Sequence, residues 1–325
     1  MSADIRQQAV PGGEFLVSPA PHLWRWLSTT RTMYSVVLAL LLPTAASIYF
    51  FGYYALKVIA VSIVTAVATE YLAKKLRRQA FVMDGSAVIT GLLLGLVLPP
   101  TIDLWMVALG AFFAIAIAKE AFGGLGHNIF NPALAGRAFL QVSFPLAMST
   151  WILPSGFGPD AVTSASPLSE AFSWEASKLQ LYKELFLGNT SGSIGETSEL
   201  LILLGGILLI ALRIIDWRTP LAYIGTVALL SLALGQDPIF HILSGGLMLG
   251  AFFLATDYVT TPITRWGRFI FGLGAGILTV IIRLYGSLPE GVCFSILIMN
   301  AFVPLIDRYV TLKPYGLKKG VKGGG

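Results

Sequence analysis

A hydroxyl-rich segment between two prolines is the first part of this 325-residue chain whose composition suggests chemistry. Small residues surround an acidic group and three hydroxyl groups between Pro159 and Pro167, and the residues of interest are Asp160, Thr163, Ser164, Ala165 and Ser166. Small neighbours leave a hydroxyl oxygen accessible to an enzyme that attaches a group to it. Serine and threonine between prolines are also typical of a solvated turn. The segment therefore predicts either a covalent attachment site or an exposed turn.

A helix start at residues 128–132 is the second candidate. Asn131 has the residue type of an N-terminal cap, and Pro132 suits the first turn that follows it. Free backbone N–H groups at such a start could bind a phosphate or the polar edge of a ring. Asn128 and Asn131 are therefore candidate binding residues. Arg137 continues the same apolar run and is expected to face a polar partner or an anionic group.

Motifs for other cofactors are absent from the sequence. The single cysteine, Cys293, has no partner for a disulfide or an iron–sulfur ligand set, and the three histidines form no cluster. No glycine-rich dinucleotide motif follows a strand pattern, and no P-loop is present. Any redox cofactor would therefore be organic or belong to a neighbouring subunit, and we expect neither a catalytic side chain nor a metal site.

The composition indicates which elements must position these residues. Hydrophobic residues make up 55% of the chain and charged residues 12%, about half the charged fraction of a soluble domain. A membrane-spanning helix needs about 20 apolar residues. The sequence therefore predicts an all-α polytopic membrane protein with about ten transmembrane helices, or nine if one segment is re-entrant. The ten apolar runs lie near 33–53, 57–73, 86–101, 103–119, 128–146, 199–216, 219–235, 238–256, 268–285 and 290–307.

The distribution of basic residues predicts the orientation of these helices. Ten spans with a cytoplasmic N-terminus place 17 of the 22 lysines and arginines on the cytoplasmic side, as the positive-inside rule requires. We therefore expect the chain to lie in the inner membrane of the cell, with both termini in the cytoplasm. The expected parts are an N-terminal segment 1–32, a first transmembrane half 33–146, an outer loop 147–198, a second half 199–309 and a tail 310–325.

An internal similarity suggests how the two halves are related. Residues 123–140 align without gaps to residues 286–303, with identities that include Gly123 and Gly286, and Leu134 and Leu297. Because the first copy would start inside and the second outside, the pattern predicts two inverted five-helix repeats, with ligands bound at matched broken helix starts. Chance similarity between glycine- and leucine-rich spans is the alternative.

Five long motifs carry a resemblance to a known family. The segments 83–100, 123–140, 188–206, 255–272 and 283–309 resemble, in order, the RnfD subunit of the Rnf complex, and the similarity extends from about Ser18 to Tyr309. Rnf is an ion-translocating ferredoxin:NAD oxidoreductase that is similar to the sodium-translocating NADH:quinone oxidoreductase. The resemblance implies an electron-carrying membrane subunit. The inverted repeat by itself would also allow a small-solute or ion transporter without a flavin.

The resemblance also implies a role for the hydroxyl-rich segment. Residues 160–166 are similar to the motif at which bacterial flavin transferases attach FMN through a phosphodiester. Asp160, Ser164 and Ala165 occupy motif positions, and Ser166 stands where the family usually has threonine. Serine keeps the nucleophilic oxygen, so Ser166 is the expected acceptor. Thr163 is the fallback acceptor, and a chain without covalent flavin is the third possibility.

Further ligands and partners are expected. The broken helix starts at matched positions of the repeat allow a second, non-covalent flavin such as riboflavin near Asn128, Asn131 and Arg137. The implied protein partners are other membrane subunits, an iron–sulfur subunit, an NADH-binding subunit and, at the maturation stage, a flavin transferase. Basic clusters near the span ends are expected to contact membrane lipid and not nucleic acid.

Overall fold

The computed structural model describes residues 28–154, 163–164, 168, 177–286 and 291–311. Nearly all of the regular structure in these residues is helical. The longer helices are α1 (Thr29–Leu76), α2 (Ser86–Leu96), α3 (Leu104–Ile115), α4 (Pro132–Ser143), α6 (Lys178–Leu187), α7 (Glu199–Ala211), α8 (Arg218–Ala233), α11 (Arg265–Tyr285) and α12 (Val292–Tyr309). The short elements are α5 (Pro145–Ser149), α9 (Pro238–Ile242), α10 (Leu247–Leu249), the π-helices η1 (Ala116–Glu120) and η3 (Gly250–Leu254), the 3₁₀ turn η2 (Ile194–Glu196), and the strands β1 (Trp151–Ile152) and β2 (Thr163–Ser164).

Helix α1 contains two of the predicted spans. Its 48 residues include a break at Gly52, where φ is 68° and ψ is −150°. This backbone conformation is essentially restricted to glycine. The predicted helices 33–53 and 57–73 are therefore two arms that meet at Gly52. Helices α1, α11 and α12 are the described helices that are long and apolar enough to cross a membrane.

Several predicted spans are shorter or broken in the structure. The predicted helix 128–146 begins at Pro132 and divides into α4 and α5, while the predicted helix 238–256 divides into α9, α10 and η3. Gly245 and Gly246 cause the second break, because both have a left-handed backbone with φ of 66° and 64°. The described residues therefore do not form ten continuous spans, although their mostly helical structure agrees with the prediction.

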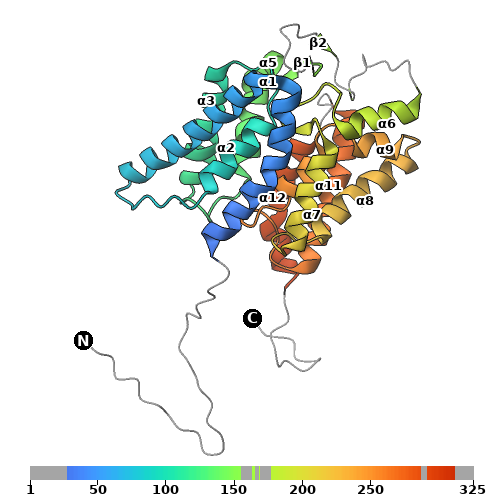
Figure 1. Ribbon diagram of the computed structural model, residues 1–325. Coiled ribbons are helices and arrows are strands. Elements are labelled where there is room, and N and C mark those ends of the chain that lie inside the picture. Colours follow the sequence, from blue (N-terminus) through green and yellow to red (C-terminus); the bar gives the residue numbers. More distant parts are fainter. Residues whose placement is uncertain (1–27, 155–162, 165–167, 169–176, 287–290, 312–325) are drawn as a thin grey trace, which may run out of the picture.

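The two halves of the chain lie side by side in Figure 1. Helices α1 to α5, in blue and green, form one half, and α7 to α12, in yellow and red, form the other. Contacts of α1 with α7 and of α4 with α12 join the halves. The start of α1 and the end of α12 lie at one end of the molecule, opposite α5 and the β1–β2 pair (Figure 1).

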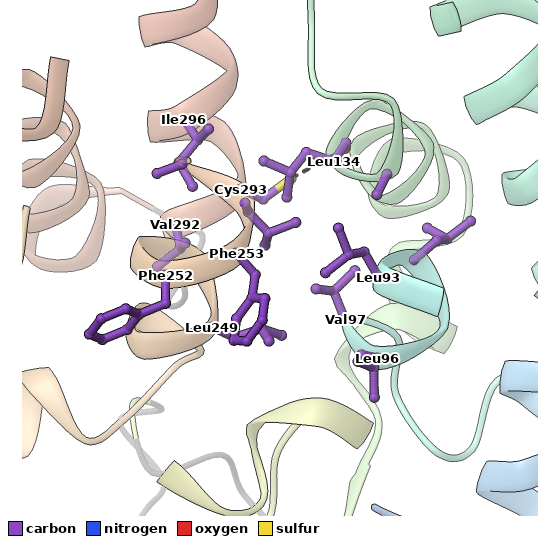
Figure 2. Close-up of a cluster of buried hydrophobic side chains, with 14 of the residues drawn as sticks. Leu93, Leu96, Val97, Leu134, Leu249, Phe252, Phe253, Val292, Cys293 and Ile296 are labelled. Atoms are coloured by element: carbon purple, nitrogen blue, oxygen red, sulfur yellow. Dashed lines mark hydrogen bonds between the residues drawn. The ribbon is translucent and has the colours of Figure 1, made fainter. Parts of the chain in front are cut away.

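A hydrophobic core fills the junction between the halves. Figure 2 shows Leu93 of α2, Val97 directly after it and Leu134 of α4 facing Phe253 of η3 and Cys293 of α12. Close packing of α2 on α1 supports this core, because a Cβ on Gly91 would lie 2.7 Å from the Ile63 Cα atom. The core thus fixes the position of the α4 start, which the sequence identified as a candidate binding element.

Candidate ligand cavity and attachment loop

A cavity at the junction of the two halves contains two of the predicted site residues. Asn128 and Asn131 lie in its wall, and its volume is about 80 Å³. Its apolar wall includes Leu93, Phe252 and Phe253. The polar part is contributed by both halves and includes Ser86, Thr90, Lys119, Asn128, Asn131, Thr256 and Asp257. An apolar wall with a few polar groups is the usual composition of a site for a small organic ligand.

Lys119 is a buried cation in the cavity wall. Its side chain lies near the end of the π-helix η1 and is 1% exposed. The Nζ atom donates to Glu70 Oε1 at 3.0 Å and to Ser86 Oγ at 2.6 Å. A buried charge of this kind is tolerated because it is paired and hydrogen-bonded. Since π-helical turns are frequent at functional sites, the location of Lys119 favours a role in ligand binding.

The hydrogen bonds of Lys119 continue to the loop that precedes α2. Ser86 Oγ donates to Asp84 Oδ1 at 2.6 Å, and the Ser86 backbone N–H donates to the same oxygen at 2.9 Å. Burial raises the pKa of Asp84, but these bonds and the nearby Lys119 and Lys74 lower it more, so the net shift is downward. Asp84 is therefore an ionised group that holds Ser86 in place beside Lys119.

Asn131 caps helix α4 as the sequence predicts. Its side-chain oxygen accepts hydrogen bonds from the N–H groups of Ala133 at 3.1 Å and Leu134 at 3.3 Å. The Ala135 N–H donates to the Asn131 carbonyl, and Pro132 has no N–H to offer. The donors of the first turn are thus occupied. The expectation that free backbone N–H groups of this turn bind a ligand is therefore wrong.

Asn128 lies in the same cavity wall, three residues before Asn131. Its side-chain Nδ2 donates to the Phe130 carbonyl at 3.1 Å, and the residue is 6% exposed. The amide therefore has further hydrogen-bonding capacity on the cavity side. Of the two asparagines in the wall, Asn128 is the one that could bind a ligand directly.

Arg137 is not in the wall of this cavity. It lies six residues after Asn131 on α4, a rise of about 9 Å along the helix. Its Nη1 atom is 4.0 Å from Glu196 Oε1 at η2, and both side chains are buried. The structure therefore separates Arg137 from Asn128 and Asn131 and gives it the polar partner that the sequence analysis expected.

The hydroxyl-rich segment is described only in part. Thr163 and Ser164 form β2, whose register with β1 places Ile152 opposite Thr163 and Trp151 opposite Ser164. Leu168 packs against Gly245, since its Cδ1 atom occupies the space that a Cβ on Gly245 would need. Asp160, Ala165 and Ser166 lie outside the described residues. Within the described part, the segment is anchored to β1 and to the second half of the chain.

Sequence reasoning did not identify Lys119 as a site residue. It follows an apolar run and resembles the basic residues that mark a cytoplasmic span end. Its partners Glu70 and Ser86 are 49 and 33 residues away in the sequence. The one available signal was a Lys119-Glu120 pair that directly continues a helix of high hydrophobicity, where a charge needs a partner.

Known proteins resemble this chain over nearly its whole length. Component D of the proton-translocating ferredoxin:NAD(+) oxidoreductase complex of Clostridium ljungdahlii is 49% identical over 321 residues, covering 94% of this chain and 97% of the relative. Component D of the Na(+)-translocating complex of Acetobacterium woodii is 46% identical over 307 residues, covering 93% and 96%. Component D of the ion-translocating oxidoreductase complex of Escherichia fergusonii is 36% identical over 351 residues, covering 94% and 99%.

These relatives confirm the resemblance to RnfD that the motifs indicated. The sequence profile described as NQR2, RnfD, RnfE matches residues 16–316, which include both halves, the cavity and the hydroxyl-rich segment. The chain therefore belongs to the NQR2, RnfD, RnfE family.

Proposed function

We propose that this chain is the flavin-carrying membrane subunit of an ion-translocating electron-transport complex of the ferredoxin:NAD oxidoreductase type. The observation that carries the proposal is the similarity to the D components of such complexes over more than nine-tenths of the chain. The relatives named for proton and sodium translocation are 49% and 46% identical, so overall similarity does not favour one ion. The chain would be one subunit of the redox enzyme, with ferredoxin and NAD bound by others.

Covalent FMN on Ser166 is the first part of the proposal. A phosphodiester from the FMN phosphate to the Ser166 oxygen would tether the cofactor to the segment between β2 and Leu168. Two anchors support this position: the pairing of β2 with β1, and the contact of Leu168 with Gly245. Thr163 is a poorer acceptor because its backbone lies in the paired strand. The flavin would supply one-electron transfer, and the chain would supply position and electrostatics.

A second, non-covalent flavin such as riboflavin in the junction cavity is the other part. The chemistry of the wall suits a flavin ring, with Leu93 and Phe253 for its faces and Thr90, Lys119 and Asn128 for its polar edges. The volume does not suit it as it stands. A cavity of about 150 Å³ holds benzene, so a three-ring system requires the 80 Å³ space to widen. Arg137 would take no direct part, because it lies outside this wall.

The wider setting of the chain is proposed on the same basis. Both termini would face the cytoplasm of a cell with the chain in its inner membrane, and the attachment loop would face outward. Other membrane subunits, an iron–sulfur subunit and an NADH-binding subunit would complete the complex, and membrane lipid would surround it. A flavin transferase would modify the loop after it reaches the outer side.

In-gel ultraviolet fluorescence of the denatured chain tests the covalent flavin. The chain is expressed with a flavin transferase, because without the enzyme a negative result would have no meaning. We expect a fluorescent band for the wild type and for Ser166→Thr, no band for Ser166→Ala, and a retained band for the matched control Thr163→Ala. A band that survives Ser166→Ala and disappears with Thr163→Ala would assign the acceptor to Thr163 instead.

A small-solute or ion transporter is the second candidate function. The cavity between two halves of the chain is the observation that favours it, because transporters place their binding sites there. A transporter has no need of a flavin. A wild-type chain that contains neither covalent nor extractable flavin, after expression with the transferase, would support this candidate.

A further inference from the structure

A buried carboxyl group without a hydrogen-bond partner lies at the start of α7. Glu199 is 1% exposed. In the part of the chain that the structure describes, neither of its carboxyl oxygens has a hydrogen-bond partner. Buried polar groups in proteins are almost always hydrogen-bonded, so an exception of this kind needs an explanation. The Glu199 side chain belongs neither to the junction cavity nor to the attachment motif.

Glu199 belongs to a group of four charged residues, which we call the Glu199 cluster: Arg137, Glu196, Glu199 and Arg283. The charges that act on Glu199 are those of Glu196 and Arg283. Glu196 lies 4.0 Å from Arg137 and accepts from the Ser193 N–H at 3.4 Å. Glu196 therefore has a charged partner and a hydrogen-bond donor, whereas the Glu199 carboxyl oxygens lack any hydrogen bond among the described residues.

Three hydrogen bonds from Arg283 go to backbone carbonyls. Its Nη1 atom donates to the His241 carbonyl at 2.6 Å, and its Nη2 atom donates to the carbonyls of Ser244 at 2.8 Å and Gly245 at 3.3 Å. Its positive charge is thus close to Glu199, but no hydrogen bond joins the two described side chains. An ionised Glu199 would lose its water without replacing it, which costs far more free energy than burial of the neutral acid.

The cluster lies where the attachment segment contacts the second half of the chain. Leu168 Cδ1 and Arg283 Nη2 both approach the position that a Cβ on Gly245 would occupy. Glu196 Oε1 approaches the corresponding position on Gly246. Leu168, Arg283 and Glu196 therefore meet at two neighbouring glycines. A change of charge in this cluster would therefore change the electrostatic potential near Leu168, where the attachment segment contacts the second half.

We propose that Glu199 is a proton-binding site whose carboxyl group holds a proton at neutral pH. Proton uptake forms one O–H bond between a carboxylate oxygen and a proton from water, and no electron is transferred. The formal charge of the four residues then changes from zero to +1. A positive cluster beside the attachment segment would favour an added negative charge there, and this consequence rests on the proposed function.

A proton satisfies the geometry better than a metal ion does. Among the described residues, no group of three or more histidine, cysteine, aspartate or glutamate side chains is arranged to hold a metal ion. A single buried carboxyl group can bind a proton without further ligands, whereas a metal ion needs several.

Infrared spectroscopy of the full-length, flavin-free chain in detergent tests the proposal. Spectra in H₂O and D₂O are compared for the wild type, Glu199→Gln and the matched control Glu196→Gln. We expect the carbonyl band of a protonated carboxylic acid in the wild type, its loss in Glu199→Gln and its retention in Glu196→Gln. If Glu199→Gln instead keeps the acid band and loses carboxylate bands, Glu199 is ionised in the wild type and the proposal is overturned.

Two further measurements complete the test. If Glu199→Gln does not fold, Glu199→Asp is used instead. A shift in the frequency of the acid band relative to the wild type supports the proposal, and an unchanged frequency overturns it. Added NaCl at constant pH should leave the band unchanged, and a sodium-dependent change in carboxylate bands would make Glu199 a metal ligand instead. Because flavin is absent from these samples, failure to flavinylate the chain would not change the result.

Discussion

The side-chain oxygen of Asn300 accepts a hydrogen bond from the backbone N–H of Asn131 at 3.1 Å, across 169 residues of sequence. Each asparagine also donates from Nδ2 to a carbonyl of the second half, Asn131 to Leu254 at 3.2 Å and Asn300 to Thr260 at 2.9 Å. Both side chains are buried. The two amides thus join α4 to α12 and to the segments around η3, and they hold one wall of the cavity.

Replacement of Asn300 by alanine should therefore loosen the junction. The change leaves the Asn131 N–H and the Thr260 carbonyl without partners, at about 1–3 kcal/mol for each buried group. We expect Asn300→Ala to lower the free energy of unfolding by about 2–4 kcal/mol and to reduce the thermal midpoint in detergent. Asn128→Ala, which removes one short-range bond to Phe130, is the control and should cost less. Equal midpoints for the two variants would contradict the bridging role of Asn300.

Gly52→Ala tests the break in α1. A side chain at this φ and ψ is strained by about 1–3 kcal/mol, so the thermal midpoint of this variant should fall. Gly225→Ala on α8 is the matched control, because a Cβ there meets no atom within 4 Å and the residue lies within a regular helix. The control should be neutral or slightly stabilising. A Gly52→Ala variant as stable as the wild type would mean that α1 is not broken at this residue.

Lys119→Met should affect both stability and the junction cavity. Removal of one partner of a buried ion pair costs about 3–5 kcal/mol, although Lys74, 3.1 Å from Glu70, will reduce the loss. The double variant Lys119→Met, Glu70→Gln should recover part of the stability, because the buried Glu70 carboxylate is no longer present, although Lys74 loses its partner. If the cavity binds riboflavin, both variants should release less flavin than the wild type on denaturation. If the amount of released flavin changes with the stability of the variants and not with the presence of Lys119, then Lys119 has a structural role alone.

Helix positions were predictable where a local signal determines them. The predicted span 268–285 agrees closely with α11, which begins at Arg265 because Thr264 caps it through the Gly267 N–H. The helix start at Asn131 and Pro132 was likewise found from local cap chemistry. In contrast, the span predicted at 238–256 ignored the two adjacent glycines, Gly245 and Gly246, whose left-handed backbone ends the helix.

The candidate site was less predictable because its contacts are distant in sequence. Lys119 meets Glu70 and Ser86, and Glu199 lies near Arg283, only after the two halves have folded. The sequence placed Arg137 with Asn128 and Asn131 by proximity along the chain. Six residues of helix were enough to place it against Glu196 instead. The short spacing therefore correctly indicated that these residues belong to one helix and its start, but it did not show that they belong to different sites.

Single-cysteine labelling tests the proposed orientation. On a Cys293→Ala background, a cysteine replaces Lys178, an exposed residue at the start of α6 in the predicted outer loop. A membrane-impermeant maleimide should label it in intact spheroplasts. The control replaces Lys75, near the end of α1 on the predicted cytoplasmic side, and should be labelled only after lysis. The reverse pattern would invert the topology and place the hydroxyl-rich segment in the cytoplasm.

The contact between α6 and α9 should depend on pH. Tyr182 donates to the Asp237 carboxylate, which also caps α9 by accepting from the N–H groups of Ile239 and Phe240. Burial raises the pKa of Asp237, but these three hydrogen bonds and Lys178 lower it more, so its pKa lies below the ordinary value. For an aspartate with a lowered pKa in the folded state, the stabilisation is present above the unfolded value of about 3.9 and is lost as the pH falls through the folded value.

Tyr182→Phe removes one of these bonds and makes the pH dependence measurable. Because the pair is partly exposed, we expect a loss of about 1 kcal/mol at neutral pH. The difference in thermal midpoint between the variant and the wild type should stay constant from about pH 7 to about pH 5. Below about pH 3.9 it should shrink as Asp237 becomes protonated and accepts less strongly. In the Asp237→Asn background, adding Tyr182→Phe should change the thermal midpoint by only a small amount at every pH. A difference between Tyr182→Phe and the wild type that grows as the pH falls would contradict the lowered pKa of Asp237.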